Sequence, residues 1–106
     1  MANVLLHRDV PSDVEGITSY LEGRNPAAAR RFATRIFATI DELAKMPGMG
    51  SLKNYGLRKL REVRTWSMRD FRKILILYYP VEGGIRVVAV AHGARQLRKL
   101  LRQRLP

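Results

Sequence analysis

An unbroken apolar segment, Ile74–Tyr79, constrains the fold of this chain more than any other feature of its sequence. It is far shorter than the roughly 20 residues that a membrane-spanning helix needs, and its β-branched and aromatic side chains favour a strand. Because neighbouring side chains of a strand point to opposite faces, a strand without polar positions must be covered on both sides. The segment therefore predicts a central strand, Phe71–Tyr79, with other elements packed against each face of its sheet.

The first half of the chain supplies a strand and two helices. The apolar residues Asn3–Leu6 predict a first strand. Ser12 and Glu15 have the spacing of a capping box, which predicts a helix that begins after Ser12 and ends at Gly23. We expect this helix to cover part of the sheet with its apolar residues.

A second helix is predicted directly after the first. Asn25 is a good N-cap and Pro26 suits the first helical position, and Pro47–Gly50 ends the helix. Its apolar residues recur at helical spacing: Phe32, Ile36, Ile40 and Leu43. Two helices joined by so short a break predict an antiparallel helical hairpin.

The second half changes to the period of strands. We predict strands over Leu60–Trp66, Phe71–Tyr79 and Ile85–Ala91, followed by a helix after Ala94 that carries leucines at helical spacing. The expected fold is a single α+β domain over residues 1–106, with the order β-α-α-β-β-β-α. A helical hairpin lies on a small, mostly antiparallel sheet, with a further helix at the C-terminus.

Positive charge is concentrated in the second half of the chain. Residues 1–50 carry six basic and six acidic side chains, whereas residues 51–106 carry fourteen basic and three acidic ones, which accounts for the net charge of +11. Such asymmetry indicates a polyanionic target or an acidic protein partner. A solvated basic face that serves solubility alone is the other interpretation.

Several kinds of chemistry are excluded by residues that the sequence lacks. It has no cysteine, so disulfides and thiolate sites are impossible, and two histidines are too few for a histidine metal cluster. Gly48-Met49-Gly50 precedes no Lys-Ser or Lys-Thr, so it is not a phosphate-binding loop. We expect no metal, no cofactor and no membrane partner, and a cytoplasmic location. Arginine-based chemistry or binding alone remains.

Four residues are candidates for that chemistry. Arg61, Arg64 and Arg72 fall on adjacent predicted strands, where they could line one basic surface. They could stabilise charge on a scissile phosphate or bind an anionic partner without catalysis. His92 follows the last predicted strand and could transfer a proton, or it could bond to the backbone of a turn.

Taken together, four stretches of the chain resemble the ParE/RelE superfamily of toxins from bacterial type II toxin–antitoxin systems, in its ParE-like, plasmid-stabilisation branch. The matching stretches are Arg24–Phe32, Leu43–Gly50, Trp66–Pro80 and Val90–Arg95. The resemblance implies a toxin with one of two targets. ParE-like members inhibit DNA gyrase by binding it, whereas RelE-like members are ribosome-dependent endoribonucleases that cut messenger RNA.

Carried over position by position, the RelE-type site is incomplete here. Arg72 matches its strand arginine, but its paired lysines fall near Val63 and Thr65, and its C-terminal tyrosine falls near Leu100. We therefore expect gyrase inhibition, with endoribonuclease activity as the alternative and an inactive toxin or plain nucleic-acid-binding domain as the lesser one. Under the endoribonuclease alternative, the catalytic residues are Arg72, Arg61, His92 and Arg95.

The resemblance also implies a cognate, ParD-like antitoxin as partner. The small residues Ala27–Ala29 could leave a groove in the helical hairpin for an antitoxin helix. The C-terminal helix either packs on its own sheet or is shielded by the antitoxin. The residues expected to bind target or partner are Arg61, Arg64, Arg72, Arg95, Leu97, Arg98, Leu101 and Arg102.

Overall fold

A five-stranded sheet with the order β1-β5-β4-β3-β2 organises the molecule. The computed structural model describes residues 2–52, 63–93 and 96–105. β1 runs parallel to β5, and all other neighbours are antiparallel, as the sequence predicts. The strands are β1 (Asn3–Leu6), β2 (Ser51–Leu52), β3 (Arg64–Met68), β4 (Phe71–Val81) and β5 (Gly84–His92).

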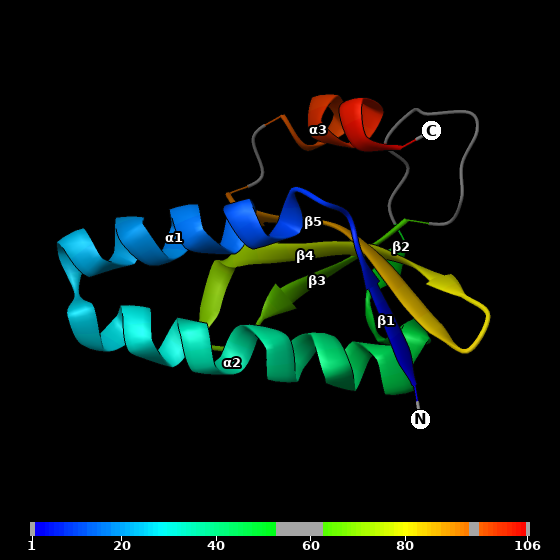
Figure 1. Ribbon diagram of the computed structural model, residues 1–106, viewed down its shortest axis with the longest axis horizontal. Coiled ribbons are helices and arrows are strands. Elements are labelled where there is room, and N and C mark those ends of the chain that lie inside the picture. Colours follow the sequence, from blue (N-terminus) through cyan, green and yellow to red (C-terminus); the bar gives the residue numbers. More distant parts are fainter. Residues whose placement is uncertain (1, 53–62, 94–95, 106) are drawn as a thin grey trace.

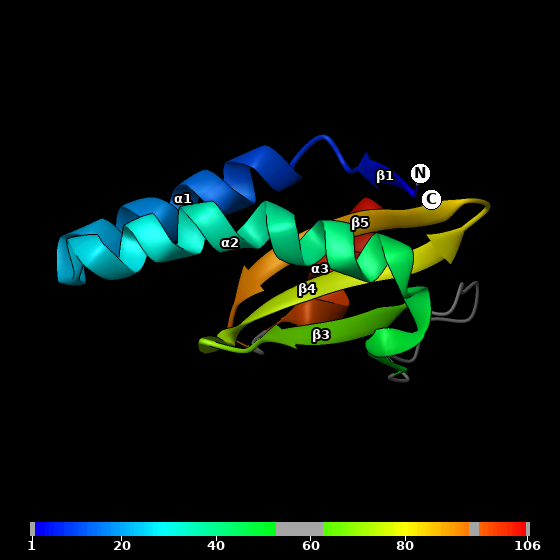
Figure 2. The same cartoon turned by 90° about the horizontal axis from the view of Figure 1, so that it is seen from below.

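Helices cover both faces of this sheet (Figures 1 and 2). The hairpin of α1 (Val10–Arg24) and α2 (Pro26–Lys45) lies on one face, and α3 (Leu97–Arg104) lies on the other. A short 3-10 helix, η1 (Pro47–Met49), links α2 to β2. The predicted α+β class and element order are confirmed, with η1 and the two-residue β2 as additions.

Two apolar clusters form the core, one on each side of the sheet. On the hairpin side, Ile74, Ile76 and Tyr78 of β4 pack against the buried stripe of α2. On the other side, Leu77 and Tyr79 pack with α3. β4 is therefore covered on both faces, as its unbroken apolar sequence predicts.

The start of α1 differs from the prediction. The helix begins at Val10, with Asp9 as N-cap residue, so Ser12 lies inside the first turn and the predicted capping box is wrong. Val10 is completely buried in the hairpin-side cluster, and Pro11 fits a first helical turn because that turn needs no amide donor there. Burial of Val10 thus decides where the helix begins.

The boundary between α1 and α2 follows the sequence closely. The Asn25 side chain accepts a hydrogen bond from the Ala28 amide at 3.2 Å, and Pro26 opens α2. The strands differ more: β3 runs on to Met68, and β4 runs through Pro80 to Val81. The predicted strand residues 60–62 and the predicted helix start at residues 94–95 lie outside the described residues.

The Tyr78 hydroxyl ties the end of α2 to the sheet. It accepts a hydrogen bond from the Gly50 amide at 2.8 Å and donates one to the Pro47 carbonyl at 2.8 Å. Gly50 is required here, because a Cβ on it would lie 2.7 Å from the Tyr78 hydroxyl oxygen. Burial raises the pKa of Tyr78, although the Gly50 amide and the nearby Arg64 lower it in part.

Candidate interaction surfaces

Two of the candidate residues meet at one end of the sheet. β4 begins and β5 ends there, since Ile74 is paired with His92 and the Gly93 amide donates to the Lys73 carbonyl at 2.6 Å. Arg72 and His92 are both exposed. The His92 ring also packs against Tyr20 of α1, with ring centres 4.9 Å apart. The structure therefore places Arg72 and His92 at the same accessible end of the sheet, on neighbouring strands.

Arg64 has a different environment from Arg72. Its guanidinium donates to the Gly50 carbonyl at 2.7 Å and to the Gly48 carbonyl at 3.3 Å, and its buried Nε has no hydrogen-bond partner within the described part of the chain. These bonds hold η1 and β2 against β3, so the side chain stabilises the fold. Two further candidates, Arg61 and Arg95, lie outside the described residues.

The four candidates on α3 divide into two pairs. Leu97 and Leu101 are buried against the sheet, so α3 packs on its own sheet in this structure. Arg98 and Arg102 are exposed on its outer side. α3 contains no acidic residue, which leaves a basic outer surface over this face of the molecule.

An ion pair that the sequence analysis did not find fastens α3 to the rest of the fold. Arg104 donates to the two carboxylate oxygens of Asp13 at 2.6 and 2.8 Å, and to the Val88 carbonyl at 3.0 Å. Asp13 also accepts from the Val90 amide at 3.0 Å. Asp13 raises the pKa of Arg104, partly against the effect of burial. We call this group the α3 clasp.

The α3 clasp forms hydrogen bonds with the exposed edge of β5. β1 pairs with β5 only as far as Val87, so the edge beyond it has no partner strand in the described residues. A register shift between Leu77 and Tyr78 adds one residue to β5 at this point, as a β-bulge does. Asp13 and Arg104 satisfy backbone groups that this edge leaves unpaired.

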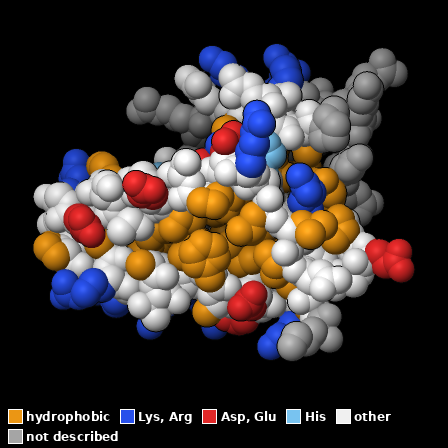
Figure 3. Space-filling view, viewed as in Figure 1, with side chains coloured by type: hydrophobic (Ala, Val, Ile, Leu, Met, Phe, Trp, Pro, Cys, Tyr) orange, Lys and Arg blue, Asp and Glu red, His pale blue; other side chains and the backbone are white. Residues whose placement is uncertain are grey.

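Exposed apolar side chains form a second surface on the hairpin side. Leu5 and Leu6 of β1 and Phe37 of α2 are each at least 36% exposed. Figure 3 shows hydrophobic side chains gathered over the facing sides of α1 and α2 and toward β1. We call this surface the apolar face. The alanines of the predicted groove contribute little to it, because Ala28 and Ala29 are buried.

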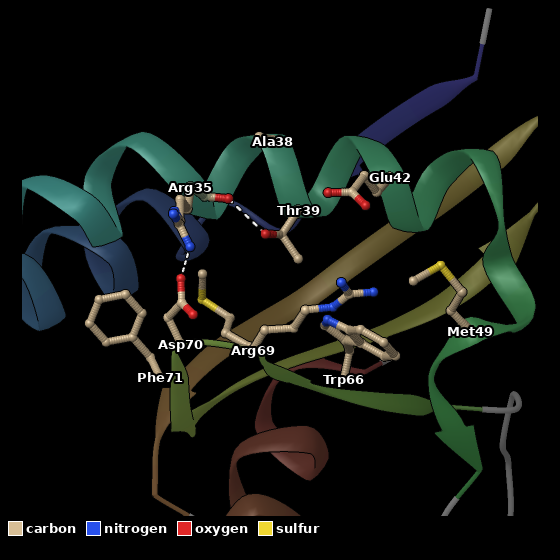
Figure 4. Close-up of a pocket in the computed structure, with 10 residues that line it drawn as sticks. Arg35, Ala38, Thr39, Glu42, Met49, Trp66, Arg69, Asp70 and Phe71 are labelled. Atoms are coloured by element: carbon tan, nitrogen blue, oxygen red, sulfur yellow. Dashed lines mark hydrogen bonds and ion pairs between the residues drawn. The ribbon is translucent and has the colours of Figure 1, made fainter.

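A hollow of about 280 Å³ lies between α2 and the β3–β4 turn. Met49, Trp66, Met68 and Phe71 provide its apolar lining, and Arg35 and Asp70 form an ion pair at one end. Figure 4 shows Thr39 and Glu42 projecting from α2 toward the side chains of Arg69 and Trp66. We call it the α2–β3 hollow. Its residues come from segments far apart in the chain, and the sequence analysis did not find it.

Two kinds of feature are absent from the described residues. Among them, no three His, Cys, Asp or Glu side chains come close enough together to hold a metal ion. None of the described helices has the length and apolar character to cross a membrane.

Comparisons with known proteins agree with this picture. The family model described as the ParE toxin of the type II toxin–antitoxin system parDE matches residues 4–97. A protein named toxin RelE2 from Caulobacter vibrioides is 32% identical over 95 residues, which are 90% of this chain and 99% of that protein. A structure described as the chromosomal ParDE system from P. aeruginosa superimposes with a TM-score of 0.69. That match has 14% identity and covers 89% of this chain and 98% of the other, so it shows the fold alone.

Proposed function

Because this chain belongs to the ParE/RelE family of type II toxin–antitoxin toxins, we propose that it inhibits DNA gyrase by binding it and that a ParD-like antitoxin neutralises it. The observation that carries the choice of target is the match of the ParE toxin model over residues 4–97. The protein then acts as a binding protein, without metal or cofactor.

The basic surface supports binding to a large anionic assembly. Gyrase holds DNA while it passes one duplex through another, so a toxin that traps it approaches a strongly negative complex. Arg72 at the sheet end and Arg98 and Arg102 on α3 are exposed and basic. Concentrated positive charge speeds association with such a target.

The apolar face supports the antitoxin half of the proposal. Phe37 of α2 is 44% exposed, and Leu5 extends the surface to β1. An amphipathic helix can bury its apolar side on a surface of this kind. This site replaces the groove expected at Ala27–Ala29, because the packing of α1 on α2 buries two of those alanines.

A supercoiling assay tests the target. Purified chain is added to gyrase, relaxed plasmid and ATP, and both supercoiling and trapped cleavage complexes are read on a gel. We expect loss of supercoiling with accumulation of linear DNA, reversed by the antitoxin encoded beside this chain's gene. Full supercoiling at large excess of folded chain would contradict the gyrase proposal.

The endoribonuclease alternative keeps specific support. The relative named toxin RelE2 covers 90% of the chain, and Arg72 and His92 are exposed at the same end of the sheet. If this alternative holds, translating ribosomes yield cut messages and Arg72→Ala nearly abolishes the cuts. If binding to gyrase holds, Arg72→Ala weakens inhibition only in part. A chain that yields neither trapped gyrase cleavage complexes nor cut messages is an inactive toxin or a nucleic-acid-binding domain.

A further inference from the structure

The α2–β3 hollow and the apolar face lie on different sides of α2. Thr39 lines the hollow, and Phe37 is part of the apolar face. Side chains two residues apart in an α-helix, such as Phe37 and Thr39, point about 160° away from each other around the helix axis. A partner bound to the apolar face therefore leaves the hollow open, and a partner that reaches both must pass around α2.

Two charged side chains in the hollow have no partner among the described residues. Arg35 and Asp70 neutralise each other in an ion pair. Arg69 and Glu42, by contrast, make no side-chain hydrogen bond or ion pair with the described residues. The half-buried Trp66 ring lies beside the Arg69 guanidinium (Figure 4), and Met49 and Met68 also line the hollow. The hollow thus combines an apolar lining with an available positive group and an available negative group.

We propose that the α2–β3 hollow is an anchor site for one large apolar side chain of the antitoxin, carried by a segment that places an acidic residue beside Arg69. The inference rests on the antitoxin half of the proposed function. It adds a second attachment point to the apolar face. The antitoxin then holds α2 from both sides.

The size and charge of the hollow favour this occupant. Sites for drug-sized ligands measure about 300–1,000 Å³, so a hollow of about 280 Å³ suits a side chain better than a free cofactor. Glu42 and Asp70 line it and repel phosphate, which disfavours nucleic acid. A second copy of this chain is disfavoured because each carries a net charge of +11. A protein segment can bring one apolar side chain to the lining together with a single carboxylate for Arg69, whereas a nucleic acid brings a run of phosphates past Glu42 and Asp70.

Arg72 extends the positive end of the site. A shallower hollow beside the first shares Trp66, Met68 and Arg69 with it and is completed by Ser67 and Arg72. An acidic residue next to the anchor therefore has Arg69 and Arg72 within the same groove. Charge pairs at the rim of such a site fix register and speed binding, while the buried anchor supplies most of the affinity.

Trp66 gives the site a direct reporter, because it is the single tryptophan of the chain. In an amide NMR spectrum of isotope-labelled chain, one indole N–H signal reports on the hollow. Unlabelled antitoxin encoded beside this chain's gene, and overlapping synthetic peptides that span it, are the probes. We expect the indole signal to shift with the whole antitoxin and with one peptide that combines a large apolar residue and an acidic one.

Filling the hollow provides the mutational test. Thr39→Phe places a ring in it, and Thr34→Phe is the matched control on the exposed side of α2. The two threonines make equivalent bonds, since their hydroxyls donate to the carbonyls of Arg35 and Arg30 at 2.8 and 2.9 Å. We expect Thr39→Phe to weaken antitoxin binding at least about tenfold, the loss of one buried anchor. The control should stay within about twofold.

A charge-reversal pair keeps the test decisive should Thr39→Phe fail to fold. Arg69→Glu and Lys45→Glu change the net charge equally, and only Arg69 lines the hollow. We expect the first to weaken binding at least about fivefold more than the second. Equal effects of the two, with an unshifted indole signal, would overturn the inference while leaving the antitoxin partnership intact.

The remaining outcomes are also distinguishable. An antitoxin that does not bind the unaltered chain at all would overturn the antitoxin half of the proposed function together with this inference. An indole signal that shifts with gyrase and not with antitoxin would assign the hollow to the target, and would overturn the antitoxin as its occupant.

Discussion

A single hydroxyl, that of Tyr78, joins the end of α2 to the middle of the sheet. Tyr78→Phe removes its bonds to Gly50 and Pro47 and leaves the Gly50 amide without its partner in a buried place. We expect a loss of about 1–3 kcal/mol in the free energy of unfolding at neutral pH. Urea unfolding measures it, with Tyr20→Phe at an exposed site as the control.

The same residue predicts an alkaline dependence. Because burial raises the pKa of Tyr78 in the folded chain, the unfolded chain ionises first as the pH passes the ordinary tyrosine pKa of about 10. The stability that Tyr78 contributes is therefore complete below that pH and declines above it. The difference between Tyr78→Phe and the unaltered chain should therefore shrink as the pH rises above about 10. A constant difference would contradict this account.

Asp13 is the second residue whose replacement we expect to destabilise the fold. It accepts two bonds from Arg104 and one from Val90, so Asp13→Asn leaves the half-buried guanidinium with only the more distant Asp9 carboxylate, 3.9 Å from its Nε. We expect a loss of about 1–3 kcal/mol in the free energy of unfolding. Glu15→Gln, at an exposed position of the same helix, should change it by less than about 0.5 kcal/mol. Equal losses would show that the α3 clasp contributes no stability.

The short helix α3 depends for its stability on contacts with the rest of the fold. Eight residues are too few for a stable isolated helix, and four of those in α3 are basic with no acid among them. Its stability must come from Leu97, Leu101 and the α3 clasp. Leu101 is completely buried, so Leu101→Ala should cost about 2–5 kcal/mol. Urea unfolding and the rate of trypsin cleavage within α3 measure it, and Gln103→Ala is the exposed control.

Neighbouring residues in the sequence predict some features of this fold, whereas contacts between distant residues determine others. The boundary at Asn25 and Pro26, and the central strand through Ile76, follow from neighbouring residues and were predicted. Val10 overrode the capping box at Ser12 because burial against distant strands outweighs a local hydrogen bond. The α3 clasp joins residues 91 positions apart, and the α2–β3 hollow joins α2 to a turn after β3. No local pattern predicts such contacts.

For the whole molecule, the two surfaces predict separable partners. The apolar face lies on the neutral half of the chain, and the exposed arginines of the other half form the basic surface. We expect Phe37→Asp to weaken antitoxin binding about tenfold or more and to leave gyrase inhibition within about twofold. Ser12→Asp adds the same charge at an exposed position of α1 and serves as the control. Antitoxin titrations and the supercoiling assay measure both, and parallel losses would contradict separate surfaces.

The pairing of β1 with β5 has a consequence for biosynthesis. Asn3 is paired with Gly84, so β1 leaves the ribosome long before β5, the strand with which it pairs. At about 5–20 residues per second, that delay lasts on the order of 4–16 seconds. During this interval β1 has no native partner strand and the sheet has an unfilled edge. The complete sheet therefore cannot form until translation has passed Gly84 and the rest of β5, so a partner that needs the finished surfaces cannot bind a shorter nascent chain.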